Sequence, residues 1–195
     1  MEQVGDEKVL YVGRWNVTLR QPIPGFGWLR PEEAALRYAY KQGDLTLADR
    51  AKGDLAVVDG TRDAEGQLRP RWVIGVGHTG VRVRFFTPGG GSIWRSTDYD
   101  AREGRLWRWI TTEYVYPDDD TFHRQSESTH KYTAKFEPDG TGFVEFTDRS
   151  KPTVDVARMT EAPVSGFWMD WPQFGQWDLL ADPDYGLPPG GMPGR

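Results

Sequence analysis

Side chains able to do chemistry are concentrated in one segment, residues 121–136, "TFHRQSESTHKYTAKF". If this segment is an extended strand, alternate side chains point to opposite faces. The odd positions are polar throughout. The even positions are Phe122, Arg124, Ser126, Ser128, His130, Tyr132, Ala134 and Phe136. We predict that the even row faces the interior, because it alone carries aromatic side chains.

Half of this even row is nevertheless polar, namely Arg124, Ser126, Ser128 and His130. A solid core would carry aliphatic residues there, because an unpartnered buried polar group costs about 1–3 kcal/mol. The row therefore predicts an interior space that holds water or the polar end of a ligand. The alternative is a strand longer than the core, whose Arg124 end projects beyond the rim.

The preceding segment, "RLWRWITTEYVY" at 105–116, can pair with this strand in two registers. If Tyr116 pairs with Thr121, Glu113 lies opposite Arg124. The inward row is then Trp107, Trp109, Thr111, Glu113 and Val115. We predict this register, because it pairs a carboxylate with a guanidinium and buries two indoles, worth several kcal/mol at about 25 cal/mol per Å².

The other register exposes both indoles to water. It places Tyr114 opposite Arg124 and Arg108 opposite His130. Glu113 faces inward in only one of these two registers.

The preferred register yields a predicted site. Glu113 and His130 are its candidate catalytic groups. A carboxyl group among aromatic rings favours its neutral form, and an imidazole changes charge near neutral pH, so either could move a proton. The predicted substrate-binding residues are Trp107, Trp109, Arg124, Ser126, Ser128 and Tyr132, together with Phe26 and Trp28 from an apolar loop described below.

Other chemistries find little support. His123 and Glu127 would lie on one strand face and His130 on the other, so three metal ligands cannot converge from this strand. The chain has no cysteine and no Gly-x-Ser-x-Gly motif, and the glycine-rich "TPGGGS" at 87–92 lacks the lysine and following helix of a phosphate loop. We expect no metal and no cofactor.

The composition limits the classes of partner and the cellular location that we expect for this chain. The chain has 195 residues, a formal net charge of −5 and acidic and basic residues mixed along its length, so we expect no nucleic-acid partner. No apolar run is long enough to span a membrane. The N-terminal "MEQVGDEKVLYVG" is acidic where a secretory signal is basic. We expect a cytoplasmic protein without a membrane partner and leave its oligomeric state open.

The elements that would position the site are short strands joined by tight turns such as "DAREGR" and "EPDGTG". We predict strands near 8–20, 35–41, 44–50, 54–59, 70–77, 80–87, 92–99, 105–116, 121–136, 141–148 and 153–159, and a helical turn in "RPEEAALRY". This order favours an all-β, antiparallel up-and-down barrel, with a β-sandwich as the alternative.

The domain prediction is one β-barrel over 1–181, followed by a flexible Pro/Gly-rich tail over 182–195. The irregular, Trp-rich segment that begins at "APVSGFWMDW" is expected to cap or wrap the barrel.

A motif at the first strand, Gly13-Arg14-Trp15, resembles the Gly-x-Trp signature of the lipocalin and wider calycin barrels. The resemblance implies a barrel with Trp15 at its closed floor and a basic residue of the last strand packed across the ring, for which Arg158 is the best match. A secreted lipocalin would carry a signal peptide and usually a disulfide, so the likeness points to an intracellular relative.

The loop at 21–34 would match the lid that this family places over the barrel mouth. It interleaves prolines and glycines with Ile23, Phe26, Trp28 and Leu29, which is too apolar for a solvated loop and too broken for a helix or strand.

Three functions are compatible with these patterns. The first is a cofactor-independent cyclase or isomerase acting on a hydrophobic or polyketide-like substrate, held by aromatic walls and shielded from water by the lid. The second is a binder or carrier of a hydrophobic small molecule. The third is an interaction module with a solid core, against which the inward polar row argues.

Overall fold

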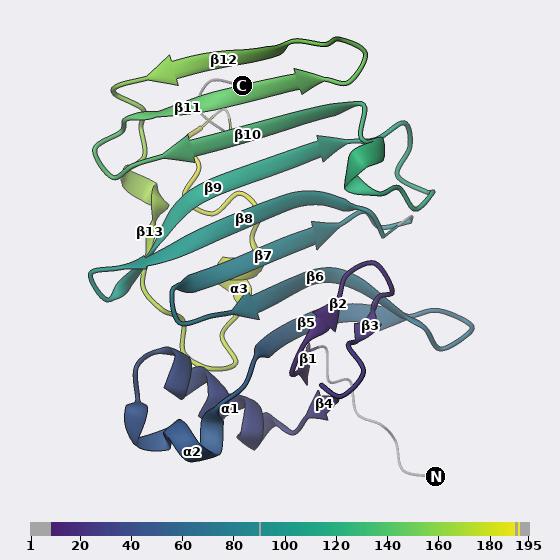
Figure 1. The fold of residues 1–195 in the computed structure, drawn as a ribbon, viewed down its shortest axis with the longest axis vertical. Coiled ribbons are helices and arrows are strands. Elements are labelled where there is room, and N and C mark those ends of the chain that lie inside the picture. The colour runs from purple at the N-terminus through teal and green to yellow at the C-terminus, as the bar shows by residue number, and fades with distance from the viewer. Residues whose placement is uncertain (1–8, 90, 190, 192–195) are drawn as a thin grey trace. The chain divides into compact units, whose positions relative to one another are not determined.

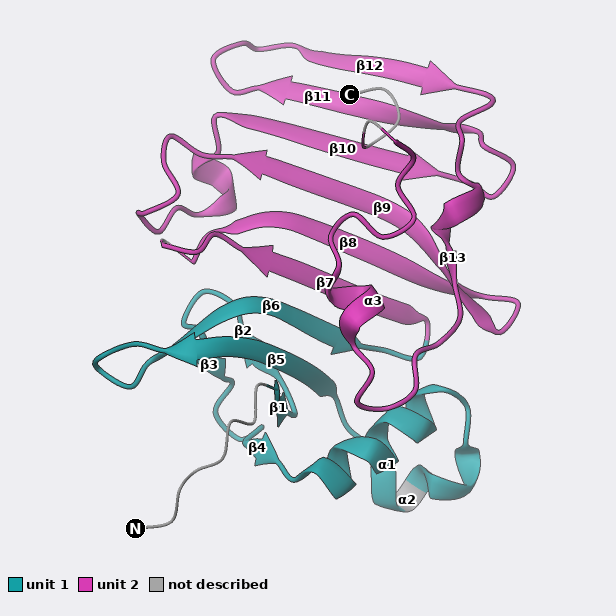
Figure 2. Cartoon of the chain, turned by 180° about the vertical axis from the view of Figure 1, so that it is seen from behind, with its two compact units in different colours: residues 1–78 teal, residues 79–195 magenta. Residues whose placement is uncertain are grey.

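The computed structural model describes residues 9–89, 91–189 and 191. The chain divides into two compact units, Met1–His78 and Thr79–Arg195, coloured separately in Figure 2. The sequence predicted one domain up to residue 181. Each unit is mainly antiparallel β-sheet with few helices, so the all-β prediction is confirmed.

Unit 1 contains a small antiparallel sheet with the strand order β6-β5-β1-β4. Its strands are β1 (Val9–Val12), β4 (Trp28–Leu29), β5 (Leu55–Arg62) and β6 (Leu68–Val76). A separate hairpin joins β2 (Trp15–Asn16) to β3 (Gln21–Pro22). The β5–β6 pair supplies much of the core, because Val57, Val58, Val73 and Ile74 are almost fully buried.

Two predicted strands of unit 1 are helical instead. The segment predicted as a strand over 35–41 lies in α1 (Pro31–Lys41), and the one over 44–50 forms η1 (Leu45–Leu47) and α2 (Ala48–Ala51). The helix has a proline in its first turn, acidic residues Glu32 and Glu33 beside it and Lys41 in its last turn. These are favourable positions for a helix start and end, and they outweigh the weak alternation of the segment.

The predicted first strand over 8–20 is also shorter than expected. It ends at Val12, resumes for two residues and stops where the Asn16 side chain accepts hydrogen bonds from the backbone N–H groups of Thr18 and Leu19, both at 3.0 Å. Such a local side-chain bond favours a turn over a strand. The predicted lid over 21–34 therefore contains β3, β4 and the first residues of α1.

Unit 2 is built on a six-stranded antiparallel meander (Figure 1). Its strands follow chain order: β7 (Gly80–Phe86), β8 (Ile93–Arg102), β9 (Arg105–Val115), β10 (His130–Phe136), β11 (Gly142–Asp148) and β12 (Val154–Met159). All six lie close to predicted strands. Among the described residues, β7 does not pair with β12, and β6 does not pair with β4, so neither unit alone closes into a barrel.

The strand predicted over 121–136 is wrong in its first half. Only His130–Phe136 is a strand, and Gln125–Glu127 forms a 3-10 turn, η2. Local hydrogen bonds explain the difference: the Glu127 carboxylate accepts from the Arg124 backbone N–H at 2.6 Å, and the Ser128 hydroxyl donates to the Gln125 carbonyl at 2.9 Å. Side chains that bond their own backbone in this way compete with strand pairing.

The register of β10 against β9 also differs from both predicted registers. Tyr132 lies opposite Glu113, and His130 lies opposite Val115. Arg124, the predicted partner of Glu113, is not part of the strand.

One face of the unit 2 sheet is covered by the C-terminal part of the chain, as Figure 2 shows. This part contains η3 (Ser165–Phe167), β13 (Trp168–Met169), which pairs with β9, and α3 (Asp178–Ala181). We call the side of the sheet that this part packs against the covered face. Its core cluster contains Trp107, Ala134, Phe136, Val144, Ala162, Val164 and Phe167. The prediction that the Trp-rich segment packs on the β structure agrees with this arrangement.

Candidate functional site

A pocket of about 600 Å³ lies where strands β7, β8 and β9 end. Its volume falls in the usual range for small-molecule sites. The lining residues all belong to unit 2: Phe86, Thr87, Pro88, Trp94, Glu113, Tyr114, Val115, Tyr116, Pro117, Asp118 and Asp119.

A β-bulge shapes one wall of this pocket. Phe85 pairs with Arg95 and Phe86 with Ile93, so Trp94 is the extra residue of β8. A bulge bends the strand locally and redirects the side chains beside it. The Trp94 ring lies 6.0 Å from the Phe85 ring, and the Arg95 guanidinium lies 4.7 Å from the centre of the Trp94 ring.

The polar centre of the site is a buried ion pair between neighbouring strands. Arg95 and Glu113 are cross-strand partners on β8 and β9. The Arg95 Nη2 donates to the Glu113 Oε1 at 2.5 Å, and both side chains are only 7% exposed. Because Glu113 lines the pocket, this pair brings a carboxylate to an otherwise largely aromatic wall.

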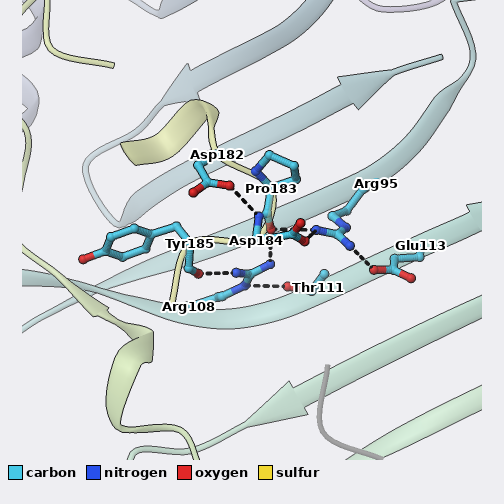
Figure 3. A network of polar contacts seen from close by, with 8 residues as sticks. All are labelled: Arg95, Arg108, Thr111, Glu113, Asp182, Pro183, Asp184 and Tyr185. Carbon is cyan, nitrogen blue, oxygen red and sulfur yellow. Dashed lines mark hydrogen bonds and ion pairs between the residues drawn. The ribbon is translucent and has the colours of Figure 1, made fainter. Parts of the chain in front are cut away.

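The same arginine holds the C-terminal strap, which we define as residues 182–187. Its Nη1 donates to the Pro183 carbonyl and to the Asp184 carboxylate, both at 2.7 Å (Figure 3). Arg95 therefore connects the pocket carboxylate on one side with the strap on the other. The sequence assigned these strap residues to a flexible tail. Residues 190 and 192–195 of that tail lie outside the described residues.

A second buried arginine, Arg108, fastens the strap further along (Figure 3). It donates to the carbonyls of Tyr185 at 2.5 Å and Pro183 at 2.9 Å, and to the Thr111 hydroxyl at 3.1 Å. Burial lowers the pKa of Arg108, and the neighbouring Arg95 adds to this effect. The strap carbonyls thus supply the polar partners that a buried guanidinium requires.

Hydrogen bonds between two loops support the opposite wall of the pocket. The Ser92 hydroxyl donates to the Thr121 carbonyl at 3.3 Å and accepts from the His123 backbone N–H at 2.7 Å. The Tyr116 hydroxyl donates to the Ile93 carbonyl at 2.7 Å, and its ring stacks on the His123 ring at 5.4 Å. Burial raises the pKa of Tyr116, so this hydroxyl stays a hydrogen-bond donor.

Asp118 organises the loop at the pocket rim. It accepts from the backbone N–H of Thr121 at 2.6 Å and of Asp120 at 3.0 Å, and its other oxygen lies 3.2 Å from the His123 Nε2. The hydrogen bond from Thr121 is the main reason why the pKa of Asp118 is lowered. These hydrogen bonds favour the anionic form of Asp118.

Of the predicted site residues, only Glu113 lines this pocket. Trp107 is completely buried in the core, where its Nε1 donates to the Phe136 carbonyl at 2.9 Å. Trp109 is half-buried beneath the Lys135 ammonium group, which lies 4.6 Å from the ring centre. The preferred inward row of 105–116 is correct for Glu113 and Trp107, but their partners differ from those predicted.

The remaining predicted residues are dispersed. Arg124 and Ser126 are exposed in the loop before β10, while Ser128 is buried. His130 and Tyr132 are half-buried on β10, and their rings lie 5.6 Å and 4.8 Å from the Phe146 ring.

Phe26 and Trp28 belong to unit 1, where Trp28 is 48% exposed and its ring lies 6.2 Å from that of Trp15. Arg158, the match for a basic residue across Trp15, is exposed on β12 of unit 2.

Sequence reasoning missed Arg95, Arg108, Trp94 and Tyr116. Arg95 follows the alternation Ile93, Arg95, Thr97 along β8, and a cation within such a row signals a buried partner. Its partner could not be named, because the pairing depends on where the strands bulge.

Two further findings concern the described residues. No three of their His, Cys, Asp or Glu side chains are grouped so as to hold a metal ion. No helix in this part of the chain has the length and hydrophobicity needed to cross a membrane.

Comparison with known proteins gives no relatives: no family model, curated protein or solved structure matches the chain.

Proposed function

We propose that the protein binds a small molecule with a large aromatic or other apolar surface in the pocket at the ends of β7, β8 and β9. The observation that carries this proposal is the combination of a pocket of about 600 Å³, four aromatic lining residues and one buried carboxylate, that of Glu113. Ligand sites are commonly of this kind, with mainly apolar walls and a few fixed polar groups that orient the ligand.

The ion pair with Arg95 suits Glu113 to the role of a fixed anchor. A guanidinium bound to one oxygen holds the carboxylate in place. Pre-organised polar groups lose less conformational freedom on binding, which favours affinity.

Binding in this pocket is tested by calorimetry with three ligands that share a benzyl group: benzyltrimethylammonium, its neutral carbon isostere neopentylbenzene, and the anion phenylacetate. We expect at least one to bind, and we expect Val115→Trp to weaken it at least about tenfold by filling the pocket. Val115 is 37% exposed at the pocket wall.

The matched control is Val156→Trp, the same change at a 52% exposed position on β12, which should leave affinity unchanged. Failure of all three ligands to bind, or equal loss in both variants, would contradict the proposal.

A second candidate function, the cofactor-independent cyclase or isomerase predicted from the sequence, rests on the same carboxylate. A carboxylate in a pocket can take a proton from a carbon next to a carbonyl group and return it elsewhere. His130 is not among the lining residues, so this proposal uses Glu113 alone.

Proton transfer is tested by deuterium exchange from D₂O into the carbon next to the carbonyl of phenylacetone, followed by NMR. Glu113→Gln keeps the shape and an acceptor for Arg95 but removes the base, so the protein-dependent exchange rate should fall at least about 100-fold. His130→Gln should leave the rate unchanged. Equal rates for wild type and Glu113→Gln would assign the pocket to binding without proton transfer.

The wider setting is proposed on the sequence alone. It comprises a cytoplasmic location, a calycin-like relationship and the absence of a cofactor or nucleic-acid partner.

A further inference from the structure

The charges around the pocket are distributed unevenly. Three of its lining residues are acidic, Glu113, Asp118 and Asp119, and none of the described lining residues is Lys, Arg or His. Asp118 and Asp119 lie at the rim, and Glu113 lies deeper, where it contacts Arg95. Among the lining residues, the exposed carboxylates of Asp118 and Asp119 are therefore the charges that an entering ligand meets first, and they attract a cation.

The buried pair of Arg95 and Glu113 belongs to a larger group of paired charges, in which the Asp184 side chain is 73% exposed. Arg95 contacts the carboxylates of both Glu113 and Asp184, and Arg108 lies close enough to interact with the same two groups. The charge of Glu113 is thus compensated within this network, whereas Asp118 and Asp119 lie outside it, in the exposed loop that follows β9.

Aromatic rings provide a second recognition surface that is independent of these charges. Phe86, Trp94, Tyr114 and Tyr116 all line the pocket, and the Tyr114 and Tyr116 rings lie nearly parallel with centroids 6.5 Å apart. The faces of such rings attract cations through their quadrupole.

The site already contains one interaction of this type. The Arg95 guanidinium stacks on the Trp94 ring at 4.7 Å, and its Nε has no hydrogen-bond partner among the residues that the structure describes. A buried N–H over a ring face is stabilised by the ring, which shows that the Trp94 environment accepts positive charge.

We propose that the pocket takes an organic cation, a ligand with an aromatic or apolar body and a quaternary or protonated amine. This inference rests on the proposed function and specifies its ligand class. The aromatic rings hold the body and one face of the cationic group, while Asp118 and Asp119 attract it from the rim. An anionic ligand would find no basic side chain among the described lining residues to compensate its charge.

The calorimetric series separates this inference from the proposed function. Benzyltrimethylammonium and neopentylbenzene have the same shape and differ in charge, so the ratio of their dissociation constants reports the effect of the charge, including the cost of its dehydration. We expect the cation to bind about tenfold more tightly at low salt. Equal affinities, or tighter binding of neopentylbenzene or phenylacetate, would overturn the inference and leave the pocket proposal standing. Binding of none would overturn both.

The rim carboxylates are tested by Asp119→Asn, which keeps the side-chain size and removes one charge. We expect the preference for the cation to fall about threefold and the remaining electrostatic part to weaken in 0.5 M salt. The matched control is Asp155→Asn on exposed β12, which changes net charge equally and should leave the preference intact. An equal effect of both substitutions would mean that overall charge, not the rim, attracts the ligand, and would overturn the assigned role of Asp119.

Discussion

Replacing Arg95 by Met is expected to destabilise the protein by about 3–5 kcal/mol, the usual cost of breaking a buried ion pair from one side. Arg95 is 7% exposed and contacts Glu113, Pro183 and Asp184. Its removal takes the guanidinium away from a buried carboxylate and also releases the strap. The free energy of unfolding from urea denaturation measures the loss.

Two further variants show whether burial of charge is the cause. Arg95→Met combined with Glu113→Gln should recover much of the loss, because the double variant leaves no buried charge in the pair. Arg105→Met removes an arginine from an exposed ion pair with Asp170, 46% and 84% exposed, and should cost no more than about 1 kcal/mol. If Arg95→Met cost no more than Arg105→Met, the buried network would not be stabilising unit 2.

Replacing Trp107 by Ala is expected to destabilise the protein by about 3–5 kcal/mol, the usual cost of truncating a buried Trp. The side chain is fully buried, and its ring lies 5.7 Å from that of Phe167 and 5.0 Å from that of Trp168. The substitution also removes the indole donor to the Phe136 carbonyl. Thermal or urea unfolding measures the change.

Trp94→Ala is the informative comparison, because Trp94 is half-buried and lines the pocket. It should cost less stability than Trp107→Ala and should weaken ligand binding more. If Trp94→Ala cost more stability and Trp107→Ala weakened binding more, Trp107 would be a ligand-binding residue, as the sequence predicted.

The strands of unit 2 could be predicted because the alternation of apolar and polar residues and the positions of the turn residues indicate the same strand limits there. The β8–β9 hairpin turns at Glu103 and Gly104, which both have positive φ, +52° and +75°. A two-residue turn of this kind fixes the pairing of the residues beside it, beginning with Arg102 and Arg105.

The partner of Glu113 could not be predicted from that turn. Counting outward from it without interruption places Glu113 opposite Trp94. The ladder instead shifts by one residue between Asp98 and Tyr99, so that Glu113 meets Arg95. A one-residue shift moves every later side chain to a new partner, and hydrophobic periodicity does not show where such a bulge will form.

The strand predicted for the segment before β10 was wrong for a related reason. Arg124, Ser126 and Ser128 alternate with polar residues on a path that could continue a strand, but Gln125–Glu127, which includes Ser126, forms a 3-10 turn supported by short-range side-chain bonds. Alternation alone does not distinguish a strand from a polar loop of the same composition. The inward polar row therefore reduces to His130 on β10, and the carboxylate chosen for its aromatic surroundings, Glu113, is the part of the candidate site that the structure retains.

The most direct test of the pocket proposal is NMR of the ¹⁵N-labelled full chain during titration with benzyltrimethylammonium. We expect the backbone amides that shift most to be those of Phe86, Trp94 and residues 113–116, with saturation at the dissociation constant found by calorimetry. Shifts concentrated on β11 and β12, or no shifts at concentrations that saturate the calorimetric signal, would contradict it.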